Sequence, residues 1–439
     1  MIKGDDPSRI VLGNSLTGED GYPGQPFDYM LANPPFGVDW KKYADPIVSE
    51  QENLGDEGRY GPGLPRVSDG SLLFLLHMLS KMKPVTHGPN GTITGGSRLA
   101  IVFSGSPLFA GAAGGGESEI RRWIIENDYL EGIVALPDQL FYNTGISTYF
   151  WILSNRKNPL RRGKIVLLDA RESFTKMRKS LGDKRKYVSP EQTAEITKLY
   201  DQATDPDLND KRVKIYNRET FGYQRITVER PLRRYWELTE DTIEGLVHEK
   251  VWAARLTPPR GTKDPVDYVH QVEHAQPALL DALRELIGHR EATETAFKKQ
   301  LTGSIPGLAL VPPNVIKAIV SAATIPDPDA PIITDRKGNP LPDPDLRDTE
   351  NIGFPDGYLG SGAPEESVLV AQAEHYLRTE IHPYVPDAWI DHSKTKIGYE
   401  IPFTRHFYEY IPPRPVAEID DELDGIEAQI QALLAGLVK

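Results

Sequence analysis

The segment Phe27-Asp-Tyr-Met-Leu-Ala-Asn-Pro-Pro-Phe-Gly37 decides which fold the chain adopts. Its apolar first half favours a short strand. Two consecutive prolines then remove two backbone donors and fix φ twice, so neither a strand nor a helix can continue through Pro34 and Pro35. The segment therefore predicts a strand that ends abruptly, with the amide of Asn33 at its end and the aromatic ring of Phe36 just beyond it.

The surrounding sequence predicts an α/β sheet. Up to about residue 170, short β-rich runs alternate with amphipathic segments, as in domains where helices cover a sheet. We expect further strands at 99–103, 130–136, 148–153 and 165–169, the last two as an antiparallel hairpin, and helices at 71–83 and 117–127. Open α/β sheets bind ligands at the carboxyl ends of their strands, which is where Asn33 lies.

The pattern becomes mainly helical after Tyr187. Ser189-Pro-Glu-Gln192 is a capping box with proline at the first helical position, and it predicts a helix to about residue 203. Further helices are expected at 237–256 and 277–301. We thus expect an α/β domain at 1–187, a helical region at 188–323, a linker or loop with eight prolines at 324–366, and a carboxyl-terminal region at 367–439.

The last element has the spacing of a coiled-coil helix. Its apolar residues alternate at intervals of four and three, namely Ile419, Leu423, Ile426, Ile430, Leu433 and Leu437. A helix this short is marginal when isolated. We therefore expect it to pack against this protein or against a partner.

Composition excludes several classes of protein. The formal net charge of −13 over 439 residues argues against a chain that coats nucleic acid by uniform positive charge. We find neither a signal-type start nor an apolar run of eighteen residues, so a cytoplasmic location is expected. Cysteine is absent, which excludes disulfides and thiolate metal sites, and no metal site is expected.

One segment departs from this acidic balance. Between Arg156 and Lys186, twelve basic residues stand against three acidic ones. The segment is either a solvated loop or a patch that binds phosphates. The candidate phosphate contacts are Arg156, Lys157, Arg161, Arg162, Lys184, Arg185 and Lys186.

The Asn-Pro-Pro-Phe motif fits the chemistry of a planar amine such as the exocyclic amine of adenine. That amine is a weak nucleophile because its lone pair is delocalised into the ring. The Asn33 oxygen and the Pro34 carbonyl could accept its two hydrogens from a rigid backbone, and Phe36 could stack on an extruded base. The ordinary alternative is a strand exit, since Asn-Pro is a common turn starter.

The motif resembles the catalytic motif of amino-group methyltransferases that use S-adenosylmethionine. Longer stretches resemble the methylation subunit of type I restriction-modification systems, at residues 10–16, 27–37, 136–148 and 397–414. The resemblance implies N6 methylation of a flipped adenine in DNA, with Asn33, Pro34, Pro35 and Phe36 as the catalytic residues. It also implies partners, namely a specificity subunit that binds the carboxyl-terminal helix and a nuclease or translocase subunit.

The chain departs from this family at its start. Members carry a helical domain and then a cofactor strand ending in Asp-Pro-x-x-Gly-x-Gly, ahead of their equivalent of Ile10. We find neither, so the resemblance implies an amino-terminally truncated chain with an incomplete Rossmann-like methyltransferase sheet, a largely missing donor site and an uncovered sheet edge. Asn14 is the one cofactor contact that we can name.

Such a chain is expected to be inactive without the missing part. Two alternatives stay open: a non-catalytic remnant that binds DNA or helps assembly, and a methyltransferase acting on a glutamine amide of a protein.

Overall fold

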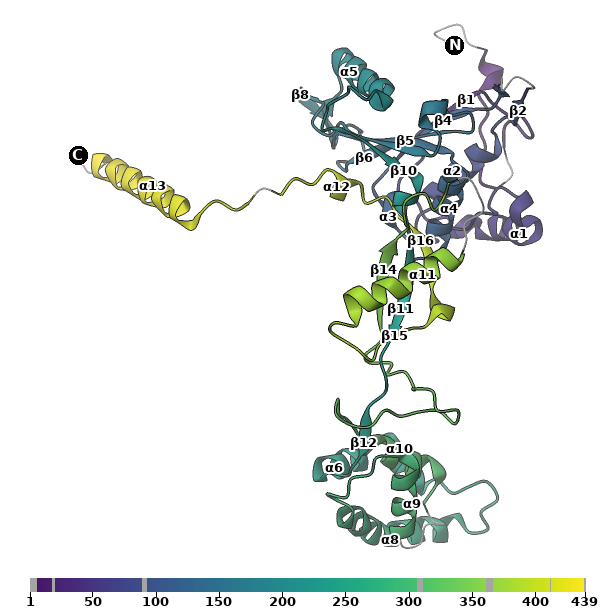
Figure 1. Ribbon diagram of the computed structural model, residues 1–439, viewed down its shortest axis with the longest axis vertical. Coiled ribbons are helices and arrows are strands. Elements are labelled where there is room, and N and C mark those ends of the chain that lie inside the picture. Colours follow the sequence, from purple (N-terminus) through teal and green to yellow (C-terminus); the bar gives the residue numbers. More distant parts are fainter. Residues whose placement is uncertain are drawn as a thin grey trace. The chain divides into compact units, whose positions relative to one another are not determined.

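The computed structural model describes residues 6–17, 20–88, 93–305, 311–360, 366–410 and 412–437. They form two compact units (Figure 1). The first comprises residues 1–223, 353–364 and 397–439, and the second comprises 224–352 and 365–396. Each unit therefore combines ranges that are far apart in the sequence.

A six-stranded mixed sheet forms the centre of the first unit, in the order β1-β4-β6-β5-β7-β10. Its strands are β1 (Tyr29–Ala32), β4 (Arg98–Phe103), β5 (Leu130–Leu136), β6 (Thr148–Ser154), β7 (Lys164–Asp169) and β10 (Val213–Asn217). β1 is parallel to β4 and β5 is parallel to β7, whereas β6 runs antiparallel between β4 and β5. The predicted α/β sheet is confirmed.

The predicted hairpin of residues 148–153 and 165–169 is wrong, because β5 lies between β6 and β7. The basic connection crosses the amino end of β5 and is tied there by ion pairs. Lys157 Nζ lies 2.6 Å from Asp128 Oδ1, and Arg161 Nη1 lies 2.9 Å from Glu131 Oε1. The charges that suggested a solvated turn therefore anchor this connection instead.

Helices cover the two faces of the sheet unequally. α2 (Ser71–Ser80) and α4 (Gly116–Glu126) lie on one side, and α5 (Pro190–Asp201) lies on the other (Figure 1). α5 begins with the predicted capping box and packs Leu199 and Tyr200 against the β5, β6 and β7 part of its face. The part of that face nearest β1 has no helix over it in the described part of the chain.

β1 ends the sheet. No described strand pairs with its outer edge. Tyr29 and Leu31 are 70% and 82% exposed, although parallel strands are normally buried on both faces. The expected uncovered edge is thus present in the structure.

The first unit holds several smaller elements. They are α1 (Ala44–Leu54), α3 (Ser106–Phe109), α12 (Phe403–His406), α13 (Val416–Leu437), the pair β2 (Val85–His87) with β3 (Ile93–Gly95), and the pair β8 (Thr175–Leu181) with β9 (Lys184–Tyr187). The segment before α12 is fixed to α4 by Arg121, whose buried guanidinium donates to the carbonyls of Tyr399, Pro107 and Ala110. Burial lowers the pKa of Arg121 to about 10.

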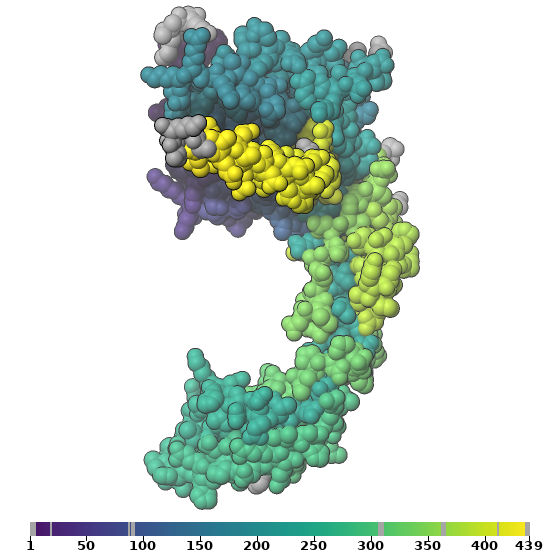
Figure 2. Space-filling view, turned by 90° about the vertical axis from the view of Figure 1, so that its left-hand side faces the viewer, coloured from purple at the N-terminus to yellow at the C-terminus, as the bar shows by residue number. Residues whose placement is uncertain are grey.

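α13 is the predicted carboxyl-terminal helix. Its side chains from Val416 to Leu434 are all exposed, including Leu423 at 56% and Ile430 at 50%. Figure 2 shows these side chains open to view along the helix. Within the described part of the chain, nothing covers its apolar seam.

The second unit is largely helical, as expected. Its helices are α6 (Glu240–His248), α7 (Lys250–Ala253), α8 (Pro265–Glu285), α9 (Glu294–Ser304), α10 (Pro313–Ala322) and α11 (Glu366–Tyr376). Its strands include β12 (Arg234–Trp236) paired with β13 (Thr324–Pro326), β14 (Asp348–Gly353), and β15 (Trp389–Ile390) paired with the end of β11 (Gly222–Glu229). β16 (Lys396–Tyr399) follows, and all but its first residue belong to the first unit.

Two expected helix boundaries are corrected. The helix at 237–256 is interrupted at Glu249, which has extended backbone angles. The helix expected to start at 277 begins at Pro265 instead, because Asp264 caps it by accepting from the amides of Val266 and Asp267, and Pro277 lies inside it. In the described ranges, no helix is long and apolar enough to cross a membrane.

Candidate functional site

Asn33 lies directly after the carboxyl end of β1. Its side chain is exposed, Pro34 is buried, and Phe36 is half-buried. Gly37 then reverses the chain with φ of +60°. No residue in the described part of the chain hydrogen bonds the Asn33 amide, so its oxygen is available to a ligand.

A loop from another strand end meets this motif. β1 and β5 point the same way, so Asn33 and the loop after β5 share the carboxyl edge of the sheet. Phe141 of that loop approaches Phe36 edge to face, with ring centroids 6.2 Å apart and an interplanar angle of 85°. Residues 137–147, the β5–β6 loop, thus form a second wall beside Phe36.

Sequence reasoning did not single out Phe141. The residue lies within the stretch 136–148 that resembled the family, so the signal was present. Sequence spacing alone could not place it against Phe36, because 104 positions separate the two residues.

The β8–β9 hairpin holds the β5–β6 loop in place. The amides of Arg185 and Lys186 donate to the carbonyl of Gln139 at 3.0 and 3.2 Å, and the amide of Asp183 donates to the carbonyl of Tyr142 at 3.0 Å. Gln139 has φ of +58°, an unfavourable angle for a residue other than glycine. The hairpin thus stabilises a strained loop at the candidate site.

Two of the candidate phosphate contacts are internal. Lys157 and Arg161 are 5% and 6% exposed. Lys157 is bound to Asp128, and Arg161 is bound to Glu131 and to the carbonyl of Tyr200. Their charges stabilise the fold and are not presented to a phosphate.

The other candidates lie nearer the surface. Arg162 and Arg185 are exposed, whereas Lys186 pairs with Asp138 and lies 3.8 Å from the ring centroid of Phe174. Arg156 lies over the ring of Tyr29, at 5.3 Å. The hairpin adds exposed cations that the sequence analysis did not put forward, namely Lys176, Arg178 and Lys179.

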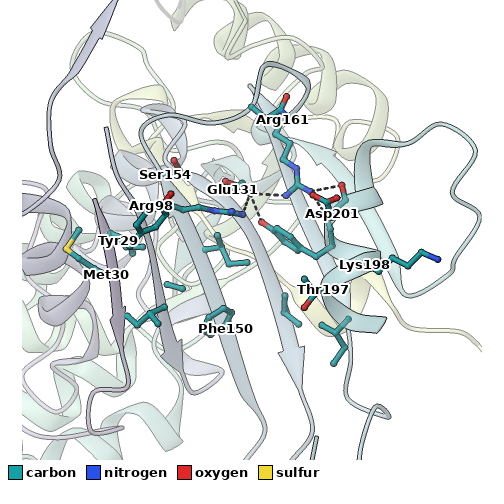
Figure 3. A pocket seen from close by; sticks show the side chains of 18 of the residues that line it. Tyr29, Met30, Arg98, Glu131, Phe150, Ser154, Arg161, Thr197, Lys198 and Asp201 are labelled. Carbon is teal, nitrogen blue, oxygen red and sulfur yellow. Dashed lines mark hydrogen bonds and ion pairs between the residues drawn. The ribbon is translucent and has the colours of Figure 1, made fainter. Parts of the chain in front are cut away.

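A hollow of about 1330 Å³ lies on the face of the sheet that α5 partly covers (Figure 3). Apolar side chains such as Leu31, Phe150 and Ile152 line much of it. Its charged end lies where β4 and β5 begin, at the edge of the sheet opposite Asn33. The hollow is therefore an uncovered part of the sheet face and separate from the Asn33 motif.

One carboxylate organises the charged end of the hollow. Glu131 Oε1 accepts from Arg98 Nη2 at 2.7 Å, from Arg161 Nη1 at 2.9 Å and from Tyr200 Oη at 3.1 Å. Burial and the carboxylate of Glu131 raise the pKa of Tyr200. These donors satisfy a carboxylate that would otherwise be costly to bury.

Asn14 makes local contacts. Its Oδ1 accepts from the amide of Leu16 at 3.1 Å, and its carbonyl accepts from the amide of Thr17 at 3.2 Å. Arg59 and Tyr60 hold the same turn by donating to the carbonyls of Ser15 and Leu16. The side-chain oxygen of Asn14 thus stabilises a turn, and its contact with a cofactor stays a prediction.

No cluster of metal-binding side chains lies beside the Asn33 motif or elsewhere in the described part of the chain. His270 and His274 are four residues apart on α8 and exposed. No group of three or more His, Asp or Glu residues that could hold a metal lies within the described ranges.

Comparison with known proteins identifies the family. The profile of the family described as N-6 DNA Methylase matches residues 1–230. The chain belongs to this family. The resemblance noted in the sequence is thereby confirmed at the level of the family.

Curated relatives are methylase subunits of type I restriction enzymes. The HindI subunit of Haemophilus influenzae is 31% identical over 146 residues, which cover 33% of this chain and 28% of that protein. The MjaIX subunit of Methanocaldococcus jannaschii is 27% identical over 193 residues, which cover 43% and 31%. The chain thus spans about a third of the length of the curated relatives that it matches.

Among solved structures, the chain is similar to the methyltransferase subunit of a type I restriction-modification system from Streptococcus thermophilus. The two are 24% identical with a TM-score of 0.36, over 47% of this chain and 38% of that one.

Substitutions of the neighbouring residues Arg161 and Arg162 test the buried ion pair between Arg161 and Glu131. We expect Arg161→Met to lower the free energy of unfolding by about 3 kcal/mol, because it removes one partner of a buried carboxylate. Arg162→Met, at an exposed position, should change it by less than about 0.5 kcal/mol. Urea unfolding of both variants measures the difference, and equal effects would contradict a structural role for Arg161.

Proposed function

We propose that this chain is part of a DNA adenine-N6 methyltransferase, corresponding to the carboxyl-terminal portion of a type I methylation subunit. One observation carries the proposal. The rigid Asn33-Pro34-Pro35-Phe36 segment ends a parallel strand with an unpaired amide and an aromatic ring that Phe141 braces. Family membership supports the same chemistry.

The motif acts by holding an amine. Asn33 Oδ1 and the Pro34 carbonyl accept the two hydrogens of the adenine N6 amine, which directs the nitrogen lone pair out of the ring plane. Phe36 stacks on the extruded base, a contact worth about 1–3 kcal/mol in single-strand binders. Because Pro34 is buried and Pro35 follows it, the Pro34 carbonyl is held in place and does not have to reorganise during the reaction.

S-adenosylmethionine, the donor that the family resemblance implies, supplies an activated methyl group. The described residues do not form a site for it. Beside β1 the described part of the sheet has an open edge, and the oxygen of Asn14 is engaged with Leu16.

We therefore place the donor site on further strands that pair with β1, in the same or a separate polypeptide. The exposed Tyr29 and Leu31 and the adjoining apolar hollow support this assignment, because a completed α/β sheet would cover both. Without these strands the chain is inactive. Among the described residues, Asn14 stays the one proposed donor contact, and its oxygen would have to leave the amide of Leu16 to make that contact.

Exposed cations of the β8–β9 hairpin bind the DNA backbone. Lys176, Arg178, Lys179 and Arg185 lie on the ribbon whose other contacts hold the wall beside Phe36. This local positive charge stands out in a chain whose formal net charge is −13. Because phosphates attract such a cluster of cations, it favours nucleic acid over a peptide that carries a target glutamine as the substrate. Lys184 can add to the same surface. Arg156 and Arg162 lie at the opposite edge of the sheet, where β1, β4 and β5 begin, so any contact of theirs with phosphates would be separate from the hairpin.

α13 binds a specificity subunit. Five residues of its seam are exposed and no described part of the chain covers them, namely Ile419, Leu423, Ile426, Ile430 and Leu433. The intervening Asp420, Asp421 and Glu422 are acidic. A two-helix or larger bundle is the usual way to bury such a seam.

The proposed hydrogen bonds from the adenine amine to the Asn33 oxygen and the Pro34 carbonyl, which we call the amide clamp, predict the effect of Asn33→Ala. In an assembly completed with the donor-binding part, the variant should lose a factor of about 10²–10³ in methyl-transfer rate, as when one preorganised hydrogen-bond partner is removed. Folding and DNA affinity should stay unchanged. Asn53→Ala, at an exposed helical position, is the control. Near wild-type methylation of DNA by Asn33→Ala would end the clamp proposal.

The charged hairpin predicts a change in salt dependence. Replacing Arg178, Lys179 and Arg185 by Gln should weaken binding to all duplexes alike and reduce the slope of log K against log salt by up to about three units. A control variant with Lys299, Arg336 and Lys337 replaced by Gln removes the same charge from the second unit. Identical slopes for both variants would show that the hairpin does not bind phosphates.

The open edge predicts weak donor binding. Isothermal titration of the 439-residue chain with S-adenosylmethionine should give a dissociation constant above about 1 mM, which corresponds to less than about 4 kcal/mol of binding free energy. Micromolar binding by the chain alone would show that the donor site lies within it, contrary to the proposal.

A further inference from the structure

Two consecutive aromatic residues of the β5–β6 loop face different surroundings. Phe141 is half-buried against Phe36, whereas the next residue, Tyr142, is 59% exposed. Phe141 and Thr144 form an isolated β-bridge, so Tyr142 and Asn143 occupy the tip of a tight turn. An exposed aromatic ring therefore stands at the rim of the site that would hold the extruded base.

The backbone under Tyr142 is fixed. Its carbonyl accepts from the amide of Asp183 at 3.0 Å. Gly182, at φ of +62°, approaches so closely that a Cβ atom there would lie 2.6 Å from the same carbonyl oxygen. Tyr142 is thus presented on a stabilised turn, which lowers the entropy that a partner must remove on binding.

A lysine side chain lies over the ring of Tyr142. Lys184 Nζ lies 5.1 Å from the ring centroid of Tyr142, and Lys184 begins the second strand of the basic hairpin. A flat ring with one ammonium group over its face can stack on bases while that lysine turns toward a neighbouring phosphate. The same hairpin therefore supplies both the support of the ring and the charges next to it.

From these observations we propose that Tyr142 is a wedge that enters the DNA duplex at the position vacated by the extruded adenine. This inference rests on the proposed function. Extrusion leaves a gap in the base stack and is unfavourable. An aromatic side chain that stacks in the gap offsets part of this cost. Phe36 and Phe141 then contact the extruded base, and Tyr142 contacts the bases that remain.

A duplex with a permanent gap tests the wedge without a methyl donor or a recognition sequence. The probe is a 20-base-pair duplex with one abasic site, compared with the fully paired duplex of the same sequence. We expect the chain to bind the abasic duplex about tenfold more tightly, which corresponds to about 1.4 kcal/mol of stacking. Tyr142→Ala should remove this preference and leave affinity for the paired duplex within about twofold, because phosphate contacts persist.

Two further variants complete the design. Tyr142→Trp should keep the preference, since its ring stacks equally well. Ile146→Ala is the matched control, because Ile146 lies in the same loop and is 47% exposed but not aromatic. Retained preference in Tyr142→Ala, equal binding of both duplexes by the unaltered chain, or an equal loss in Ile146→Ala would overturn the wedge. Failure to bind either duplex would instead contradict the proposed DNA substrate itself.

Discussion

The parallel pairing of β1 with β4 is the constraint on which the site depends. It aligns Tyr29 with Arg98 and Ala32 with Ile101, so that Asn33 leaves the sheet at the carboxyl edge. This pairing supports β1 from one side alone in the described part of the chain. The Pro-Pro step then fixes the acceptors where the strand ends. β1 thus carries the Asn33–Phe36 segment while its outer edge stays open in the described part of the chain.

Ion pairs divide the basic segment into a buried part and an exposed part. Arg161 is buried against Glu131 and Lys157 against Asp128, where they hold the β6–β7 connection across β5. The hairpin cations lie further along the same charged run and remain exposed. A buried pair is retained because removal of one partner leaves the other charge buried without a counterion. An exposed cation has no such constraint and can exchange its counterions for phosphates.

The β8–β9 hairpin links charge to aromatic geometry. Its amides stabilise the carbonyls of Gln139 and Tyr142, and the loop so held presents Phe141 to Phe36. Any contact that shifts this hairpin would therefore also shift the loop that holds Phe141 against Phe36. The strained backbone of Gln139 is tolerated because two donors fix its carbonyl.

Sequence alone was enough to locate five of the six strands of the central sheet, the capped helix after Ser189, the carboxyl-terminal helix and the Asn33–Phe36 motif, because these follow from local periodicity and from the backbone limits of proline. Tertiary structure alone decided that β5 lies between β6 and β7, that Arg161 is buried while its neighbour Arg162 is exposed, and that Phe141 lies against Phe36. Strand order, burial and ring contacts depend on residues far apart in the chain. Local pattern carries no information about which of these residues meet.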